Sequence, residues 1–148
     1  MNGHAQHSTS RRRMQGISLI EVMVSVLVLA VGLLGIAAMQ SFALRGGQGS
    51  LESTQAVMQT SAMFEMMRAN SGANYSMAKT CTAPGAGTTL VTNDQRAWIQ
   101  SLRSTIGNAN TTCGQIACAS GTCTVTVFWD DSRAGGGTAR SIVTSAGV

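Results

Sequence analysis

The chain has 148 residues and a mass of 15.3 kDa, which is enough for one domain but not comfortably for two. Hydrophobic residues make up 44% of it and charged residues only 11%, whereas roughly a quarter of a soluble globular domain is charged. Intrinsic disorder is excluded because it requires low hydrophobicity and high net charge. The formal net charge of +4 would fit a nucleic-acid or membrane-surface partner, depending on where the basic residues lie.

A basic cluster precedes one long apolar segment. The cluster consists of Arg11, Arg12 and Arg13, and residues 22–39 carry no charge, with Ser25 as their only polar side chain. At about 1.5 Å per residue, a helix of this length crosses most of a hydrocarbon core of roughly 30 Å. The basic flank predicts that the leader stays cytoplasmic and that the rest of the chain faces outward. An ordinary secretory signal fits poorly, because the apolar run is too long and no small-x-small cleavage site follows it.

Glu21 is the exception in this segment, and a plain membrane anchor would not need it. A carboxylate costs roughly 2.5–3.5 kcal/mol at the centre of a bilayer and less near its surface. One interpretation is that Glu21 lies harmlessly at the headgroup level. The other is that it meets a positive charge inside an assembly, where a low dielectric strengthens the pairing.

The segment around Glu21 reads GISLIE from Gly16 onward and follows a short basic leader. It resembles the class III signal of type IV prepilins. The resemblance implies that a prepilin peptidase cleaves after Gly16 and N-methylates the new first residue, Ile17. It also implies that Glu21 pairs with the N-terminal amine of a neighbouring subunit as the filament grows. Most members of the family have phenylalanine where this chain has Ile17.

Residues 18–22 and 28–40 resemble PilV-type minor pilins, the type IV pilus modification protein family, with type II secretion pseudopilins as the next closest group. Major pilins often carry a proline near the middle of this helix, and this chain has none there. Flexibility would instead come from Gly32 and Gly35, since glycine costs about 1 kcal/mol relative to alanine in a helix. Alternatively, these two glycines allow close packing of neighbouring helices.

We expect four segments: a leader over 1–16, a transmembrane or filament-core helix over 17–44, its amphipathic continuation over 45–70, and a disulfide-stapled α+β head over 71–148. Three glycines within residues 45–49 predict a bend or break. Helical spacing returns from 51 to 69 and predicts a buried stripe. Its expected members are Leu51, Met58, Ala62 and Met66, with Val57, Phe64 and Met67 beside them.

Residues 70–90 are rich in small and polar residues and are predicted to form a loop. Thr92 as N-cap and Gln95 then form a predicted capping box. The helix that follows, over 93–106, would direct Trp98, Leu102 and Ile106 toward the core. The spacing of Asp94 and Trp98 also resembles the PilV-type pattern.

Residues 122–129 alternate threonine with apolar residues and predict a half-buried strand. Its buried face would hold Cys123, Val125, Val127 and Trp129. Asp130 and Asp131 begin a polar loop over 130–137, which lacks the spaced acidic ligands of a calcium loop and is predicted to be a solvated turn. Residues 138–145 would form the return strand. The expected fold is therefore α+β and pilin-like, a long N-terminal helix packed on a small head with a short helix and a C-terminal antiparallel hairpin or sheet.

Four cysteines lie in the expected head: Cys81, Cys113, Cys118 and Cys123. They contain no C-x-x-C pair, and both histidines precede Gly16, which argues against a zinc site. On the periplasmic side, four cysteines favour two disulfides worth about 2–4 kcal/mol each. Three pairings are possible, and the short spacing of Cys118 and Cys123 favours 118–123 with 81–113.

The sequence contains no Ser/His/Asp or Cys/His set, no phosphate loop and no pair of acids in an apolar setting, so we expect neither an enzyme nor a cofactor. Cleavage after Gly16 would leave seven basic and six acidic side chains, and 7 − 6 gives a net charge of +1. The seven are scattered, which argues against DNA binding, although Arg96, Arg103 and Arg140 leave a local basic patch open.

The expected function is that of a minor pilin that aids assembly or initiation of a type IV pilus. Its expected partners are a prepilin peptidase, the major pilin and other minor pilins. It would wait in the bacterial inner membrane with its head in the periplasm and then enter an extracellular pilus (fimbrium). The alternatives are a type II secretion minor pseudopilin and a filament-tip module for adhesion or DNA uptake.

Overall fold

The structure is a computed structural model that describes residues 16–148. The predicted leader arginines therefore lie outside the described residues. The described residues form two units, 16–40 and 41–148, and each is described by itself. The elements in chain order are α1 (Leu19–Ala69), β1 (Met77–Thr80), α2 (Leu90–Thr105), β2 (Cys113–Ala119), β3 (Thr122–Trp129), the 3₁₀ helix η1 (Ser132–Ala134) and β4 (Arg140–Gly147).

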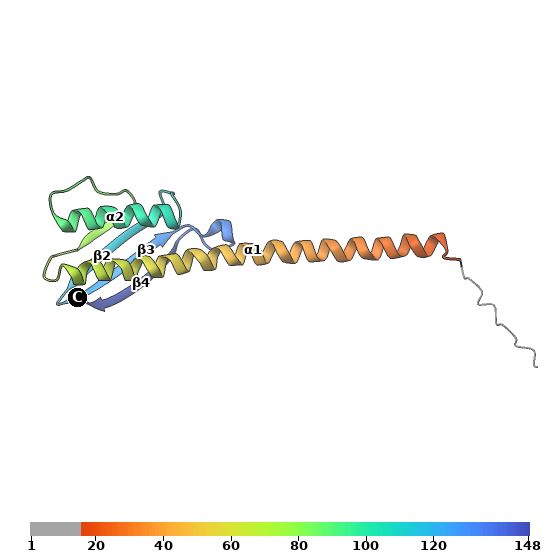
Figure 1. Ribbon diagram of the computed structural model, residues 1–148, viewed down its shortest axis with the longest axis horizontal. Helices are drawn as coiled ribbons and strands as arrows, with labels where there is room; N and C mark the ends of the chain where they lie inside the picture. Colours follow the sequence, from red (N-terminus) through yellow and green to blue (C-terminus); the bar gives the residue numbers. More distant parts are fainter. Residues whose placement is uncertain (1–15) are drawn as a thin grey trace, which may run out of the picture. The chain divides into compact units, whose positions relative to one another are not determined.

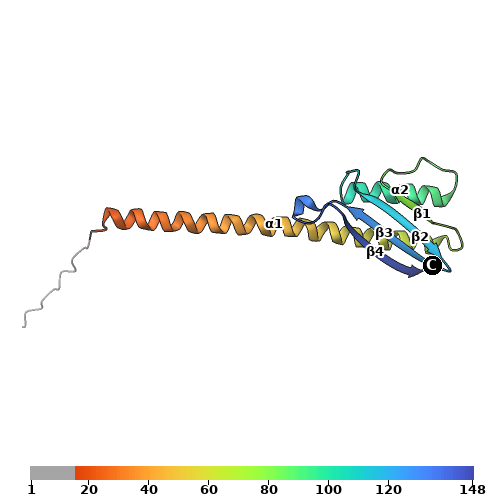
Figure 2. The same cartoon turned by 180° about the vertical axis from the view of Figure 1, so that it is seen from behind.

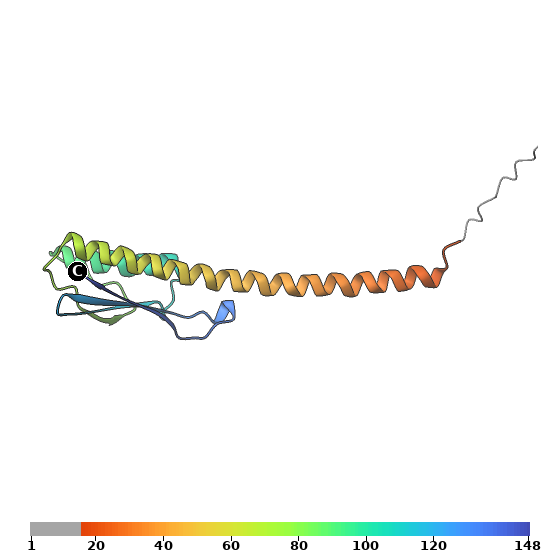
Figure 3. The same cartoon turned by 90° about the horizontal axis from the view of Figure 1, so that it is seen from below.

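This is the expected α+β pilin-like fold, a long N-terminal helix with a short helix and an antiparallel sheet (Figure 1). In the unit formed by residues 41–148, α2 and the C-terminal part of α1 cover one face of the sheet, so that helices and strands form two layers (Figure 3). The strands lie side by side in the order β1-β2-β3-β4 (Figure 2), and each neighbouring pair is antiparallel. Neither β1 nor β2 was predicted from the sequence. β1 has only four residues and an irregular register with β2, so it lacks a clear alternating pattern.

The break predicted at residues 45–49 is wrong, because α1 continues through them. Glycine weakens a helix by about 1 kcal/mol but does not forbid it. Gly49 also packs closely on the loop between β3 and β4, since a Cβ there would lie 3.1 Å from the Asp131 Oδ1 atom. Contact with the loop between β3 and β4 thus helps to keep residues 45–49 helical, although their glycines would favour a break in an isolated peptide.

The buried stripe of α1 differs from the predicted one. Phe64 and Met67 are buried as expected and Met66 is half-buried. The prediction is wrong for four residues, which are exposed: Leu51, Val57, Met58 and Ala62. The buried face of α1 consists of Ala56, Thr60, Met63, Phe64 and Met67. Methionine and alanine stand on both faces of this helix, so their spacing alone did not identify the face that contacts the sheet.

The predicted capping box of α2 is also wrong. The N-cap is Thr89, whose side-chain oxygen accepts a hydrogen bond from the Thr92 backbone N–H at 3.2 Å. Gln95 instead donates from Nε2 to the Tyr75 carbonyl oxygen at 3.0 Å. The helix therefore begins at Leu90, one turn earlier than the sequence indicated.

The core joins both helices to the inner face of the sheet. Trp98, Leu102 and Ile106 are buried, as predicted. The described core also holds the predicted inner face of β3, namely Cys123, Val125, Val127 and Trp129. Gly114 of β2 permits the close approach of α2, because a Cβ at this position would overlap the Trp98 ring.

The predicted hairpin of β3 and β4 is present, with all eight residue pairs in register from Thr122↔Gly147 to Trp129↔Arg140. The prediction of a solvated turn at residues 130–131 is wrong for Asp131, of which only 2% is exposed. Its Oδ2 atom accepts a hydrogen bond from Arg140 Nη1 at 3.0 Å, and its backbone N–H donates to Gly137. Burial of this carboxylate follows from a cation nine residues away, which local sequence patterns do not reveal.

Candidate functional site

The predicted cleavage junction lies just before α1. Gly16, Ile17 and Ser18 precede the helix in irregular backbone. The Ser18 carbonyl oxygen accepts a hydrogen bond from the Glu21 backbone N–H at 3.0 Å and so closes the first turn. Ile17 is 75% exposed, and a Cβ at Gly16 would meet no other described side chain within 4 Å. The peptide bond between these residues thus lies in exposed, non-helical chain, the form that proteases cut most readily.

Glu21 lies in the first turn of α1 and is exposed. A carboxylate there is favoured by the partial positive charge of the helix N-terminus, by about 0.3–1 kcal/mol. The ion pairs in residues 16–148 are Arg68–Glu65, Arg133–Glu52 and Arg140–Asp131. Glu21 takes part in none of them, so the described part of one chain supplies it with no cation.

The rest of the N-terminal unit is an apolar helix. Large apolar side chains from Val22 to Met39 are 49–74% exposed and lie on all sides of the helix. Ser25, its single polar side chain, donates from Oγ to the Val22 carbonyl oxygen at 2.8 Å and needs no other partner. α1 is the one helix of the described chain that is long and apolar enough to cross a membrane.

Gly32 and Gly35 both lie inside this helix, and nothing lies within 4 Å of where their Cβ atoms would be. The described chain therefore does not use either glycine for internal packing. Both of the roles expected for them, flexibility of the helix and close approach of another helix, remain predictions.

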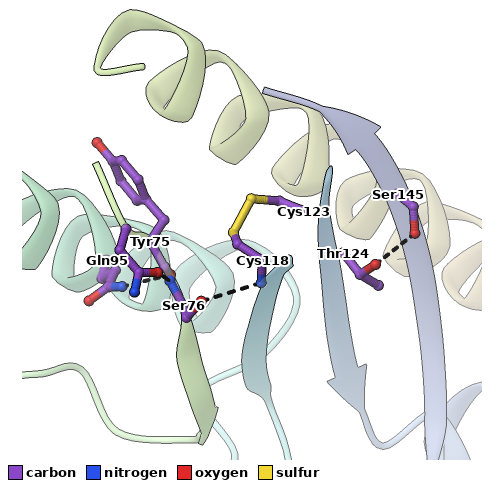
Figure 4. The surroundings of a disulfide bond; sticks show 8 residues. Tyr75, Ser76, Gln95, Cys118, Cys123, Thr124 and Ser145 are labelled. Carbon is purple, nitrogen blue, oxygen red and sulfur yellow. Dashed lines mark hydrogen bonds between the residues drawn. A yellow bond between two sulfur atoms is a disulfide. The ribbon is translucent and has the colours of Figure 1, made fainter. Parts of the chain in front are cut away.

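The four cysteines form two disulfides, Cys81–Cys113 and Cys118–Cys123, which is the pairing that the sequence favoured. Cys118 and Cys123 are directly opposed residues of β2 and β3, and their bond bridges these strands near the turn (Figure 4). A cavity of about 280 Å³ lies beside this disulfide, and its lining carries no charged side chain. The other disulfide, Cys81–Cys113, joins the segment after β1 to the start of β2.

Tyr75 connects the end of α1 with α2 and was missed by the sequence analysis. Its hydroxyl donates to Asp94 Oδ2 at 2.6 Å and accepts from Asn70 Nδ2 at 3.1 Å. Burial and the hydrogen bond to Asp94 raise the pKa of Tyr75. It is the only tyrosine in the chain, and that rarity was the one signal available. Trp98, the residue that the sequence paired with Asp94, donates from Nε1 to the Gln59 carbonyl oxygen at 3.0 Å.

The three arginines that left a local basic patch open, Arg96, Arg103 and Arg140, are not all free of contacts within the chain. Arg103 donates from Nη1 to the Cys81 carbonyl oxygen at 2.9 Å and from Nε to Asn108 Oδ1 at 2.8 Å. Arg140 lies on β4 and pairs with Asp131. Two of the three guanidinium groups are thus engaged within the chain, and only Arg96 makes no such contact among the described residues.

Comparison with known proteins identifies the N-terminal segment. The family model described as "Prokaryotic N-terminal methylation motif" matches residues 11–37. No curated protein and no solved structure matches the chain. The matched residues include the junction after Gly16, the exposed Glu21 and both helical glycines. The motif supports a type IV pilin-like protein, a structural subunit that is processed by a prepilin peptidase and assembles with other pilins.

Proposed function

We propose that the chain is a PilV-type minor pilin, which enters a type IV pilus after its leader is cleaved and its new N-terminus is methylated. The observation that carries this proposal is the arrangement around Glu21. One carboxylate, Glu21, lies in the first turn of α1, and residues 22–44 that follow it in the helix carry no charge. Gly16 lies five residues before it, in irregular backbone. A bilayer anchor alone would be more stable without that charge.

Cleavage and methylation would act at the Gly16–Ile17 bond, where the structure has exposed irregular backbone. Cleavage removes the three leader arginines and creates a positive amine at Ile17. In apolar surroundings, this amine and Glu21 are each costly when unpaired and attract one another strongly when close. Pairing between neighbouring subunits would therefore select one axial offset, and a misplaced subunit would leave two charges unpaired.

The helix over 17–44 would hold the subunit first in the inner membrane and then in the filament core. Its apolar side chains suit both settings, because both exclude water. Residues 45–70 would continue the helix onto the head, and residues 71–148 would form this disulfide-stapled head, exposed to the periplasm. Oxidation of all four cysteines fits that compartment.

Mass spectrometry of the N-terminal peptide from sheared filaments tests this proposal. We expect a peptide that starts at Ile17 and carries one added methyl group. Unprocessed chain in filaments, or a different first residue, would show that the proposed signal is not used. A processed chain found only in the membrane would contradict the role as a filament subunit.

A type II secretion minor pseudopilin is the second candidate, because the matched N-terminal motif is shared by pilins and pseudopilins. The two functions differ in the machine that takes up the subunit. Deletion of the pilus assembly ATPase would leave a pseudopilin's incorporation unchanged but would abolish that of a minor pilin. Quantification of the processed chain in sheared surface fractions of the two strains distinguishes them.

A further inference from the structure

We propose that Glu52 and Asp131 share one proton, and that this proton holds α1 against the loop between β3 and β4. The contact would tighten as pH falls and loosen as pH rises. Both groups belong to residues 41–148. The proposal concerns residues 41–148 alone and does not depend on the role of the chain in a filament.

Asp131 supplies the fixed side of this contact. It is 2% exposed, and its Oδ2 atom accepts a hydrogen bond from Arg140 Nη1 at 3.0 Å. Its Oδ1 atom is buried and has no hydrogen-bond partner among the described residues. A buried polar atom without a hydrogen-bond partner destabilises the fold, and more so when it is charged, so Oδ1 requires a donor.

Glu52 supplies that donor. Its side chain is 17% exposed, and its Oε2 atom is likewise buried without a partner in the described chain. An ionised carboxylate can only accept hydrogen bonds, whereas a protonated one also donates. A proton on Glu52 that is donated to Asp131 satisfies the buried oxygens of both groups at once.

The surrounding charges decide which residue holds the proton. Arg140 Nη1 lies 3.0 Å from Asp131 Oδ2, so the closest cation of this cluster is paired with Asp131 and not with Glu52. The nearest cation to Glu52 is Arg133, whose Nη2 is 4.0 Å from Oε1, and whose side chain is 75% exposed. Such a distant, exposed pair contributes little. Glu52 also lines a surface pocket together with Thr105 and Ile106 at the end of α2, and neither of these two residues carries a charge.

Burial raises the pKa of Glu52, and repulsion from Asp131 raises it further. The hydrogen bond with Asp131 and the charge of Asp130 act in the same direction, whereas Arg133 lowers it. Protonated Glu52 therefore stabilises the folded unit of residues 41–148. This contribution is fully present below the unfolded pKa of Glu52 and is lost as pH rises through the higher folded value.

Two glycines allow the carboxylate of Asp131 to come close to the backbone on both sides. A Cβ at Gly49 of α1 would lie 3.1 Å from Oδ1, and a Cβ at Gly136 of the loop would overlap the carboxylate. The loop also folds around Asp131, whose carbonyl oxygen accepts from the Gly136 N–H at 2.9 Å. A change in the charge of Glu52 thus acts on a tightly packed contact rather than on a solvent-filled gap.

A direct test observes the side-chain carboxyl carbons of glutamate by NMR in the full chain in non-ionic detergent. The chain has three glutamates, Glu21, Glu52 and Glu65, and their signals are assigned with single Glu→Gln variants. We expect the Glu52 signal to titrate at higher pH than that of exposed Glu65. Titration of Glu52 at or below the pH of Glu65 would overturn the proposal.

A second test measures the urea midpoint of unfolding from the fluorescence of Trp98 and Trp129, the two tryptophans, both buried in the core. Gln at position 52 can donate to Asp131 but cannot ionise. We expect Glu52→Gln to raise the midpoint at about pH 7.5 and to leave it unchanged near pH 4, where wild-type Glu52 is protonated. Glu65→Gln is the matched control on the same helix and should show no such pH-dependent gain.

The same assay separates a shared proton from a bound cation. With a shared proton, millimolar calcium or a chelator leaves the midpoint of the wild-type chain unchanged. A higher midpoint in calcium that Glu52→Gln abolishes would overturn the proposal, because the pair would then hold a metal ion. A lower midpoint of Glu52→Gln at neutral pH would overturn it as well.

Discussion

Glu21 forms no ion pair with any of the described residues 16–148. We predict that Glu21→Ala leaves cleavage intact, because the junction at Gly16 is unchanged, but lowers incorporation into filaments. Loss of a pairing worth only about 1.4 kcal/mol would reduce incorporation roughly tenfold. Immunoblots of sheared filaments and of membranes measure both quantities.

Two variants calibrate this experiment. Glu65→Ala removes an exposed carboxylate of α1 that pairs with Arg68. Incorporation of this variant into filaments should remain normal. Gly16→Glu should prevent cleavage and mark the position of the uncleaved precursor on the gel. Normal incorporation of Glu21→Ala would refute the charge-pairing mechanism.

Gly114 is the residue at which the packing of α2 on β2 is tightest. An alanine here would force the Trp98 ring and the Ile99 Cδ1 atom to move, because both lie too close to the new Cβ. Overpacking of this kind costs about 1–3 kcal/mol. We expect a lower urea midpoint for Gly114→Ala by tryptophan fluorescence. Gly85→Ala, at a position with open space around it, should change the midpoint little.

At the scale of elements, the sequence predicted the structure correctly where the conformation depends on residues close together in the chain. The alternation in residues 122–129 identified β3 and its buried face, and the spacing of Trp98, Leu102 and Ile106 identified the inner side of α2. The motif around Gly16 was likewise visible, because it depends on consecutive residues. Fold class and disulfide pairing followed from these features and from the cysteine spacing.

The remaining errors have one physical cause, which is contact between distant segments. The buried face of α1 is set by the sheet, so Ala56 and Met63 are buried while Leu51 and Met58 are not. In β2, Gly114 leaves room for the Trp98 ring of α2. The sequence of this strand does not alternate regularly between apolar and polar residues. The pairing of Glu52 with Asp131 joins residues 79 positions apart in sequence (131 − 52), beyond the reach of any local rule.

The two disulfides should differ in their contribution to stability. Cys81–Cys113 closes a loop with a sequence separation of 32, and Cys118–Cys123 one of only 5. The entropy of loop closure gives about 4 kcal/mol for the first and about 2 kcal/mol for the second. We predict that replacing the first pair by alanine lowers the free energy of unfolding more than replacing the second. Equal losses in urea titrations would show that strain or residual unfolded structure dominates.

At the scale of the whole molecule, the basic character belongs to the precursor. The net charge is +4 with the leader and +1 in side chains after Gly16, and Arg103 and Arg140 are engaged within the head. We predict that the processed chain does not retard DNA in a gel at physiological salt. The uncleaved precursor, produced without prepilin peptidase, should bind more strongly, since affinity follows the number of free cations.

A DNA shift by the processed chain that Arg96→Ala abolishes would contradict this prediction. It would favour the filament-tip module with a role in DNA uptake. A shift that disappears only when the leader is removed would support the interpretation that the leader carries the charge.

Lys79 of β1 has its ammonium group 4.0 Å from the centre of the Phe128 ring, and it is the only lysine in the chain. Apart from the N-terminal amine, it is therefore the only site at which an amine-reactive dye can form a stable bond. Labelling of the purified chain would therefore place one fluorophore at a known position on the edge strand β1 of each molecule.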